Sequence, residues 1–470
     1  MSIATQTTVA AVAVATTAPI ASDQLTGTAG TAVSAASAAF VATAGTAASA
    51  VSVATTGTAA SAAIGVDVLD PTRSHVLGHP AVLPTLPAAR RGPGPDYSKR
   101  PMLVFWETTR ACALACKHCR ASATMQALPG ELTTAQGKDL IDQIAGFGRP
   151  YPILVLTGGD CLMRPDLFEL VEYATGLGLP TALSPSVTPT LTAAMIEKIV
   201  ASGVKAVSIS LDGASAPTHE GVRGIPGHFE DTVNAIRALA SAGLSVQVNT
   251  TVMRANVDEL ADVAALISNA GAAIWEVFFL VQVGRGVSTE AVTPDEHEEI
   301  CHFLYDASQH GFIIRTVEAP FFRRVIARRR AGDPVPTTPL YERLAGRLES
   351  LMGPPIGLPR AQTASTRDGK GIVFVAYDGE VYPAGFLPLG LGNVETTPLA
   401  EIYRDNPLLK QIRATEFTGR CGSCEYADLC GGSRARAFAS SGDPLGEDPA
   451  CPYQPGADAA ANLTTAGAGA

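Results

Sequence analysis

Positive charge is scarce in this sequence. Its 470 residues include 34 Lys or Arg and 44 Asp or Glu, which leaves a formal net charge of −10. Proteins that bind nucleic acids need clustered cations to neutralise the phosphate backbone. We therefore expect no nucleic acid among the partners of this chain.

The first 66 residues lack nearly all of the groups that build a folded core. They consist mainly of Ala, Thr, Ser, Val and Gly and carry almost no charge. With so few large apolar side chains, this tract cannot bury enough surface to offset the entropy lost on ordering. We expect residues 1–66 to be a disordered extension and residues 67–100, rich in Pro, Gly and Arg, to be a linker.

Targeting and membrane signals are also missing. The start, MSIATQTT, has no basic residue, which argues against a signal peptide. The stretch Thr28–Val66 has no charge, but its Thr, Ser and Gly content makes it a poor membrane span. We expect a cytoplasmic protein without a membrane span.

The cysteine pattern does not suit a disulfide framework. There are nine cysteines, an odd number, and seven of them fall in two tight clusters. Such clusters indicate metal ligation in a reducing cytoplasm. The other two, Cys161 and Cys301, are expected to be small buried thiols.

The first cluster is the most informative feature. Cys112, Cys116 and Cys119 follow the apolar run Leu103–Trp106 with the spacing Cys-x3-Cys-x2-Cys. Three thiolates on a four-iron cluster leave one iron open, and an open iron can bind a ligand that reacts. A zinc site that borrows a fourth ligand and three unrelated thiols are the alternatives.

From residue 101 onward, strand-like and helix-like segments alternate. The predicted strands are Leu103–Thr108, Ile153–Leu156, Thr181–Ser184, Ala206–Leu211, Ser245–Thr251 and Ile274–Val281. The predicted helices are Thr134–Ala145, Pro165–Thr175, Thr192–Ala201, Phe229–Ala242 and Val257–Ala270. This alternation predicts an α/β fold with a parallel sheet. Six units favour a partial (β/α)6 barrel of the TIM type, with a doubly wound sheet as the alternative.

In either layout, reactive groups collect where parallel strands end. The cysteine loop follows the first predicted strand. The segments that follow or end the next four strands are Gly158-Gly159-Asp160, Ser184-Pro185-Ser186, Asp212-Gly213 and Asn249-Thr250. We expect these segments to surround one site.

These motifs together resemble the radical S-adenosylmethionine (SAM) enzymes. The resemblance rests on the cysteine spacing, its place after a first strand, and His118 before the last cysteine. It implies that Cys112, Cys116 and Cys119 hold a [4Fe–4S] cluster whose open iron chelates SAM. One electron from that cluster then yields methionine and a 5′-deoxyadenosyl radical, which abstracts hydrogen from unactivated carbon.

The same resemblance implies the SAM contacts. Gly158-Gly159-Asp160 is similar to the Gly-Gly-Glu segment that holds the methionine amino group, although a tight turn also explains the two glycines. His118 corresponds to the aromatic residue beside the adenine. The residues expected at the ribose or the methionine carboxylate are Ser184, Ser186, Arg223 and Asn249. For Arg223, a surface ion pair is the alternative.

The second cluster has the spacing Cys-x2-Cys-x5-Cys-x20-Cys and comprises Cys421, Cys424, Cys430 and Cys451. Four thiolates saturate either a structural zinc or a [4Fe–4S] cluster. Beside a radical SAM core, the pattern resembles a SPASM domain with an auxiliary [4Fe–4S] cluster. Ala384 stands where peptide-maturing relatives have a further cysteine.

The long last interval is similar to the tetrapyrrole-modifying branch of these enzymes. The segments His118–Ser122 and Leu387–Val394 also resemble that branch, and the resemblance covers roughly residues 101–455. It implies a small-molecule substrate, a haem-related tetrapyrrole, with oxidative decarboxylation or loss of its side chains. A flavodoxin or ferredoxin is expected to supply electrons. A peptide maturase and a zinc-stabilised binding protein are the alternatives.

The domain boundaries follow from these matches. We expect the radical SAM core in residues 101–330, a connecting segment in 331–370, the auxiliary domain in 371–455 and a disordered tail in 456–470.

Propionate groups on such a substrate require cationic partners. Arg285 and Arg315 are candidates, whereas the run Arg323–Arg330 is interpreted as a solvated helix face. Glu276 and Glu318 lie among apolar residues near the expected site, where burial raises a carboxyl pKa.

Overall fold

The computed structural model describes residues 95–287, 290–361 and 365–456. The predicted extension, residues 67–94 of the predicted linker and residues 457–470 of the predicted tail lie outside this part of the chain.

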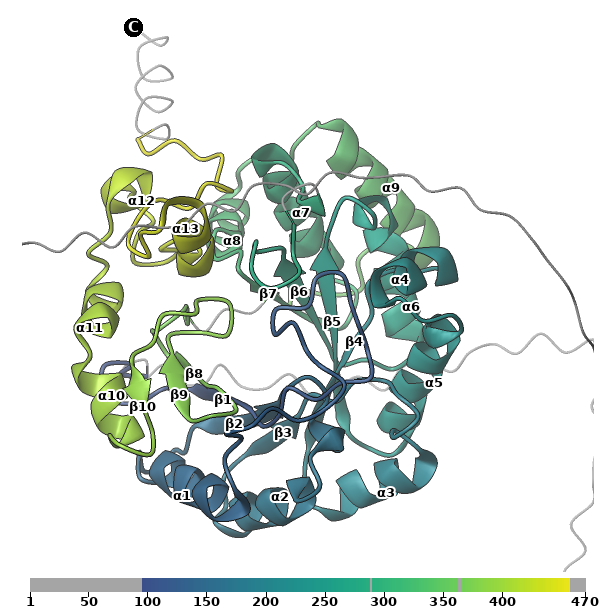
Figure 1. Cartoon of the computed structure of the whole chain (residues 1–470). Coiled ribbons are helices and arrows are strands. Elements are labelled where there is room, and N and C mark those ends of the chain that lie inside the picture. The colour runs from purple at the N-terminus through teal and green to yellow at the C-terminus, as the bar shows by residue number, and fades with distance from the viewer. Residues whose placement is uncertain (1–94, 288–289, 362–364, 457–470) are drawn as a thin grey trace, which may run out of the picture. The chain divides into compact units, whose positions relative to one another are not determined.

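The core is a curved sheet of parallel strands in sequential order. Its strands are β1 (Leu103–Glu107), β2 (Ile153–Thr157), β3 (Thr181–Leu183), β4 (Ala206–Ser210), β5 (Ser245–Val252), β6 (Ile274–Phe279) and β7 (Ile313–Val317). All six predicted strands are present, and β7 extends the series by one. Because parallel crossovers are right-handed, sequential order places every helix on the same face of the sheet. The result is a partial barrel, as predicted, and not a doubly wound sheet (Figure 1).

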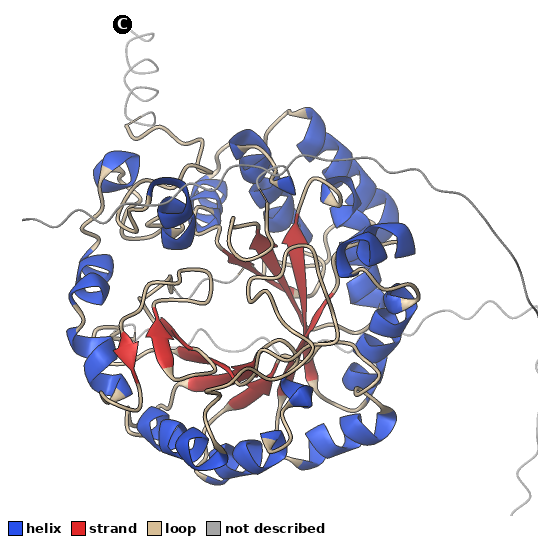
Figure 2. Cartoon of the chain, in the orientation of Figure 1, coloured by secondary structure: helices blue, strands red, loops and turns tan. Residues whose placement is uncertain are grey.

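Helices line the outside of this barrel, and loops gather at its mouth (Figure 2). The helices of the barrel are α1 (Thr134–Ala145), α2 (Leu167–Gly176), α3 (Ala193–Ala201), α4 (Ala216–Arg223), α5 (His228–Ser241), α6 (Leu260–Asn269), α7 (Pro294–Ala307), α8 (Phe322–Ala331) and α9 (Pro339–Met352). The five predicted helices correspond to α1, α2, α3, α5 and α6.

Alternation along the strands separates the core from the barrel interior. In β6, Trp275, Val277 and Phe279 are fully or almost fully buried, whereas the residues between them are partly exposed. The buried set packs against the helices. The alternate set, which includes Glu276, faces the interior.

The C-terminal region adds to the same sheet. Strand β8 (Ile372–Val375) pairs in parallel with β1 on the side opposite β2, and β9 (Glu380–Tyr382) and β10 (Gly392–Asn393) follow it antiparallel. The remaining helices are α10 (Leu399–Asp405), α11 (Pro407–Ala414), α12 (Gly419–Ser423) and α13 (Arg434–Ser441). Two distant segments of the chain therefore share one sheet.

No helix of the described ranges combines the length and the apolar character that a membrane span requires.

Helix α1 lies unusually close to the sheet at one glycine. A capping box between Thr133 and Gln136 starts the helix. A Cβ at Gly137 would lie 2.7 Å from the Trp106 ring and 3.0 Å from Leu170. The absence of a side chain there allows the fully buried indole to fit beneath the helix.

We predict that Gly137→Ala lowers the free energy of unfolding by about 1–3 kcal/mol, because overpacking exceeds the gain in helix propensity. Gly346→Ala is the matched control: Gly346 is inside α9, and a Cβ there would meet nothing within 4 Å. The control should raise stability by up to about 1 kcal/mol. Chemical denaturation monitored by circular dichroism tests both changes, and equal effects of the two alanines would contradict this account.

Glu318 connects the barrel to the C-terminal region. It follows β7, is only 7% exposed, and has a φ of +58°. Its carboxylate accepts a hydrogen bond from Ser433 Oγ, and its carbonyl accepts one from Arg436 Nη2 at 2.6 Å. Burial, and then the neighbouring Asp368, raise the pKa of Glu318 to about 8.

This pKa makes stability depend on pH. Because the folded-state pKa lies above the unfolded value, the folded protein retains a proton that the unfolded chain has already lost, and stability falls as the pH rises toward 8. Between pH 6 and pH 8, wild type should therefore lose on the order of 2 kcal/mol relative to Glu318→Gln.

Urea unfolding at the two pH values measures this difference. Glu447→Gln is the control, because Arg420 holds the pKa of the exposed Glu447 below its ordinary value and this carboxylate stays ionised throughout. Parallel pH profiles of wild type and Glu318→Gln would show that Glu318 does not titrate in this range.

Candidate functional site

The loop after β1 brings the three predicted cluster ligands together. Cys112 and Cys116 are buried, Cys119 is partly buried, and all three pack in one group with Leu114. The Cys112 N–H donates to Thr124 O at 2.7 Å, which closes the base of the loop. The backbone N–H of Leu114 points at Cys112 Sγ from 3.3 Å. Such N–H donors stabilise a thiolate.

A segment after β6 holds this loop in place. Arg285 Nε donates to Cys116 O at 2.8 Å, and the Arg285 N–H donates to Cys119 O at 3.0 Å. Gly284, with a φ of +60°, lies so close that a Cβ would be 2.4 Å from Cys119 O. Arg285 is therefore engaged mainly with the cysteine loop. Its Nη2 is buried without a hydrogen-bond partner in the described part of the chain.

Gly158 and Gly159 are required by packing of one backbone on another. A Cβ at Gly158 would lie 2.5 Å from Thr109 O, and a Cβ at Gly159 would lie 2.4 Å from Ala111 O. Hydrogen bonds from Gly159 N–H to Thr109 O and from Asp160 N–H to Ala111 O join the two segments at 2.8 and 2.7 Å. The missing side chains thus admit the backbone of Thr109–Ala111, which leads into the cysteine loop. Close approach of a ligand to Gly158 and Gly159 stays a prediction.

Asp160 is fully buried and connects the loops after β2 and β3. Its carboxylate accepts hydrogen bonds from Ser186 N–H at 3.2 Å and from Thr188 Oγ1 at 3.0 Å. Burial raises its pKa, and these hydrogen bonds oppose the shift. Ser186 Oγ in turn lies 3.1 Å from Gly159 O and 3.7 Å from Cys112 Sγ. Asp160 and Ser186 therefore both lie against the cysteine loop, as predicted from their strand-end positions.

Asp212, at the end of β4, joins two predicted SAM contacts. Its Oδ2 lies 2.9 Å from His118 Nε2 and 2.5 Å from Arg223 Nη2. Arg223 Nη1 points at Cys116 Sγ from 3.4 Å, so Arg223 is buried beside the cluster loop and does not form a surface pair. Although burial opposes ionisation, Arg223 and His118 hold the pKa of Asp212 well below its ordinary value.

Two buried histidines support Asp212 from behind. The Asp212 N–H donates to His219 Nδ1 at 3.1 Å, His219 Nε2 lies 2.8 Å from His228 Nδ1, and His228 Nε2 lies 2.9 Å from Val187 O. Because the Asp212 N–H is a donor, His219 must accept through Nδ1, and because Val187 O is an acceptor, His228 must donate through Nε2. If both rings are neutral, each therefore donates through Nε2 and accepts through Nδ1. Burial, and then Arg223, lower the pKa of His219 to about 3, in agreement with neutral rings.

Ser184 and Asn249 contact different neighbours from the other predicted residues. Ser208 Oγ donates to Ser184 Oγ at 2.8 Å, and Gln247 Nε2 donates to Asn249 Oδ1 at 2.8 Å. Gln247 also bonds Glu276, whose cross-strand partners are Asn249 and Arg315. Burial raises the pKa of Glu276, and Arg315 opposes the shift. These side chains form a polar layer inside the barrel, so Arg315 faces Glu276.

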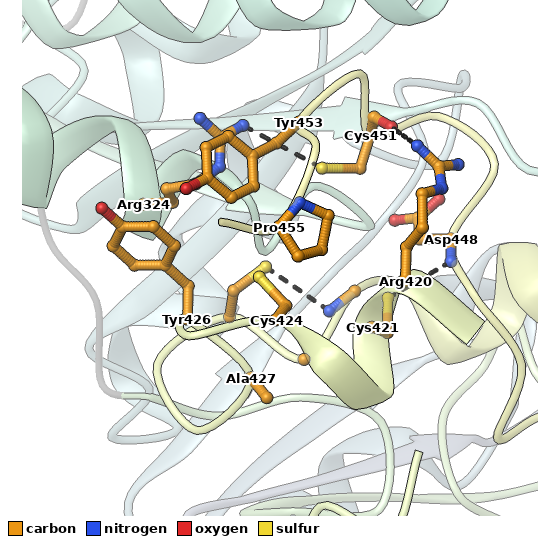
Figure 3. Close-up of a pocket in the computed structure, with 13 residues that line it drawn as sticks. Arg324, Arg420, Cys421, Cys424, Tyr426, Ala427, Asp448, Cys451, Tyr453 and Pro455 are labelled. Carbon is orange, nitrogen blue, oxygen red and sulfur yellow. Dashed lines mark hydrogen bonds between the residues drawn. The ribbon is translucent and has the colours of Figure 1, made fainter. Parts of the chain in front are cut away.

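The four C-terminal cysteines line one cavity. Cys421 and Cys424 approach it from α12 and its C-terminal end, and Cys451 approaches it from the last described segment (Figure 3). Cys430, which also lines the cavity, lies between α12 and α13 in the chain. Backbone N–H groups of Asp448 and Gly432 point at Cys421 Sγ and Cys430 Sγ, each from 3.4 Å. The structure thus assembles the second predicted ligand set.

The cysteine sets fit four-iron clusters better than single ions. Within the described ranges, no three His, Cys, Asp or Glu side chains converge closely enough to hold one metal ion. Four thiolates on one zinc must lie within about 4 Å of each other, given a Zn–S distance near 2.3 Å. In a cubane each thiolate binds a different iron, so the sulfur atoms stand farther apart. Four thiols that line one cavity without converging on a single point suit the latter.

Arginines from α8 also reach this cavity, which corrects the interpretation of the basic run as a solvated face. Arg324 is 2% exposed, pairs with Glu298 through both carboxylate oxygens at 2.7 and 2.6 Å, and lies 4.0 Å from Cys451 Sγ. Only the end of the run, at Arg330, is exposed.

The other two cysteines, Cys161 and Cys301, are fully buried core thiols, as predicted.

The comparisons with known proteins agree with this geometry. Residues 106–267 match the radical SAM superfamily, and residues 367–425 match an iron–sulfur cluster-binding domain of the SPASM type. An AdoMet-dependent heme synthase of Oleidesulfovibrio alaskensis is 41% identical over 77% of this chain and 89% of its own length. A pre-heme d1 synthase of Dinoroseobacter shibae is 29% identical over 78% of this chain and 89% of its own length.

Among solved structures, SuiB of Streptococcus suis bound to S-adenosylmethionine shares the fold. Its TM-score is 0.57 at 13% identity, over 76% of this chain and 78% of SuiB. The partial barrel, the two cysteine sites and these matches lead to one conclusion. The chain belongs to the radical SAM superfamily and carries a SPASM-type iron–sulfur domain for an auxiliary cluster.

Proposed function

We propose that this chain oxidatively decarboxylates propionate side chains of a haem-related tetrapyrrole. The similarity to an AdoMet-dependent heme synthase, at 41% identity over 77% of the chain, supports the substrate class. The observation that carries the proposal is the presence of both cysteine sites in one chain, three thiols at the barrel mouth and four around the C-terminal cavity. Peptide maturation, the alternative, has less support, because Ala384 occupies the position of a further cysteine.

At the first site, Cys112, Cys116 and Cys119 would hold the cluster that binds SAM. When bound, cluster and SAM together supply a radical that removes hydrogen from unactivated carbon. The side chains of the protein position these groups. Asp212 remains ionised and holds two side chains in place. It orients His118, which we assign to the adenine of SAM, and it fixes Arg223 beside Cys116.

The buried donors near this site that have no hydrogen-bond partner in the described part of the chain include Arg223 Nε and Arg285 Nη2. A buried unpaired guanidinium N–H is costly, so each suits an anionic acceptor brought by a ligand. We assign Arg223 Nε to the methionine carboxylate and Arg285 Nη2 to a propionate of the substrate.

The electron balance explains the need for a second site. Loss of one hydrogen atom and then of carbon dioxide turns a propionate into a vinyl group and releases one electron. The auxiliary cluster, held by Cys421, Cys424, Cys430 and Cys451, would accept that electron. A flavodoxin or ferredoxin would supply the electron that cleaves SAM, and the cytoplasm would keep the seven thiols reduced.

The two sites should separate in mutagenesis. We predict that Cys116→Ala abolishes SAM cleavage, because the first cluster loses a ligand. Cys424→Ala should leave 5′-deoxyadenosine formation and abolish the vinyl product, since the released electron has no acceptor. Anaerobic assays that quantify both compounds by liquid chromatography test this. Normal product from Cys424→Ala would contradict the role of the auxiliary cluster.

Reconstitution and a substrate assay test the function itself. Anaerobically reconstituted protein should contain about eight irons per chain, with brown absorbance, as expected for two four-iron clusters. With SAM and a reductant, iron-coproporphyrin should lose carbon dioxide and gain vinyl groups. About four irons plus one zinc would remove the electron-acceptor role. Turnover of didecarboxysirohaem without turnover of iron-coproporphyrin would contradict propionate decarboxylation and identify a different tetrapyrrole as the substrate.

A further inference from the structure

Two buried arginines beside the C-terminal cavity have no carboxylate partner. Arg434 is fully buried and Arg367 is 5% exposed. Among the described residues, no carboxylate oxygen forms an ion pair with either guanidinium within 4.0 Å. Removing a cation from water without a counter-ion is expensive, so such an arrangement requires a nearby anion.

Arg434 points directly at a cluster ligand. Its Nη2 lies 3.6 Å from Cys421 Sγ, and Nη1 donates to the carbonyl of Gly446 at 2.6 Å. The guanidinium also stacks on the Phe417 ring at 4.3 Å. Its protein partners other than the thiol are therefore neutral.

Arg367 stacks on the same Phe417 ring at 5.3 Å. Its Nη1 donates to Ala427 O at 3.0 Å, whereas Nε is buried without a hydrogen-bond partner in the described part of the chain. A Cβ on Gly431, which lines the cavity, would collide with Arg367 Nη1. Burial, and then Arg323, lower the pKa of Arg367 to about 10, so the side chain remains a cation at neutral pH.

The other charged groups at the cavity are already balanced. Arg324 pairs with Glu298, Arg420 pairs with Glu447, and Asp448 pairs with Arg436. Beyond ion-pair distance, Asp428 interacts electrostatically with Arg367, and Asp368 with Arg434. Burial raises the pKa of Asp368, which disfavours its anionic form. Arg367 and Arg434 thus leave positive charge beside the thiols that no carboxylate of the described residues neutralises within 4.0 Å. A four-iron cluster with four thiolates has a net charge of about −2 when oxidised and −3 when reduced, counted from its sulfides and thiolates. Fixed cations stabilise the reduced form more, because its charge is larger.

We propose that Arg367 and Arg434 raise the reduction potential of the auxiliary cluster and so allow it to take the electron released by substrate decarboxylation. The inference rests on the proposed function, because it presupposes a redox-active cluster at the C-terminal site. The step is balanced: the substrate radical loses carbon dioxide and one electron, and the oxidised cluster gains that electron.

The test uses the full chain with Cys112, Cys116 and Cys119 all changed to Ala, so that only the C-terminal cluster titrates. In this background, Arg434→Gln and Arg367→Gln each remove one charge, and Arg434→Lys and Arg367→Lys retain it. Arg413→Gln is the matched control. Arg413 also donates to a carbonyl, Tyr403 O at 2.8 Å, and stacks on an aromatic ring. Its hydrogen bonds within the described ranges go to Tyr403 and Arg404 of α10, whereas Arg367 and Arg434 bond residues that line the cavity.

Iron and sulfide analysis first establishes cluster content, and a redox titration followed by electron paramagnetic resonance then gives the midpoint potential. Both Gln variants should shift the midpoint to more negative values, the Lys variants should lie near wild type, and Arg413→Gln should not differ from it. With the first cluster intact, the Gln variants should form less product per 5′-deoxyadenosine.

Unchanged midpoints in iron-loaded Gln variants would overturn this inference and leave the proposed function standing. Zinc in place of iron in the triple-Ala protein would overturn this inference together with the electron-acceptor role of the C-terminal site. Each arginine is tested independently. If one Gln variant fails to hold its cluster, the midpoint potential of the other Gln variant decides the test.

Discussion

Contact between two stretches of backbone fixes the geometry of the first site. The chain at Thr109–Ala111, which leads into the cysteine loop, lies directly on Gly158 and Gly159, and any side chain there would collide with a carbonyl. The loops after β1 and β2 therefore move as one unit. Asp160 extends the unit to the loop after β3 through Ser186 and Thr188. The ordering of the cysteines depends on this tight layer of loops at the strand ends.

The two cysteine sites differ in electrostatics. At the first, the guanidinium that points at a thiol, Arg223, is neutralised by the ionised Asp212, whereas Arg285 donates to backbone carbonyls of the cysteine loop. At the second, Arg434 and Arg367 meet carbonyls, a ring and a thiol, and no carboxylate within ion-pair distance among the described residues. Since a reduced cluster is more negative than an oxidised one, this asymmetry favours electrons on the second site. It agrees with the electron-acceptor role that we propose for the second site.

Much of the barrel could be predicted from the sequence, because short β-branched strands and capped helices have distinct periods. The elements that were not predicted include short or polar ones: α4 contains Pro217 and Gly221, and β8, β9 and β10 have four, three and two residues. They also include β7 and the 14-residue helix α9, which lie beyond the last predicted strand. Spacing alone indicated all seven clustered cysteines. The hydrogen bonds by which Asp212, His219 and His228 hold His118 and Arg223 in place could not be predicted, since they join segments that only the fold brings together.

The basic run Arg323–Arg330 shows a second limit of prediction from sequence. Its composition predicts a solvated helix, yet Arg324 is buried against Glu298 and a cysteine more than a hundred residues away. Whether an arginine faces water depends on the anions that tertiary structure places beside it, and a local pattern does not contain that information.

The pairing of β8 with β1 has a consequence for the order of folding. Residues 372–375 hydrogen-bond to 103–106, the strand that leads into the cysteine loop. During synthesis, one edge of β1 therefore stays unpaired until residues 372–375 have emerged. Pairing across so many residues is slow, and the open edge is meanwhile a site for aggregation. A truncated barrel without the C-terminal region would keep that edge open. Completion of the C-terminal domain and completion of the barrel are thus coupled, because both depend on the pairing of β1 with β8.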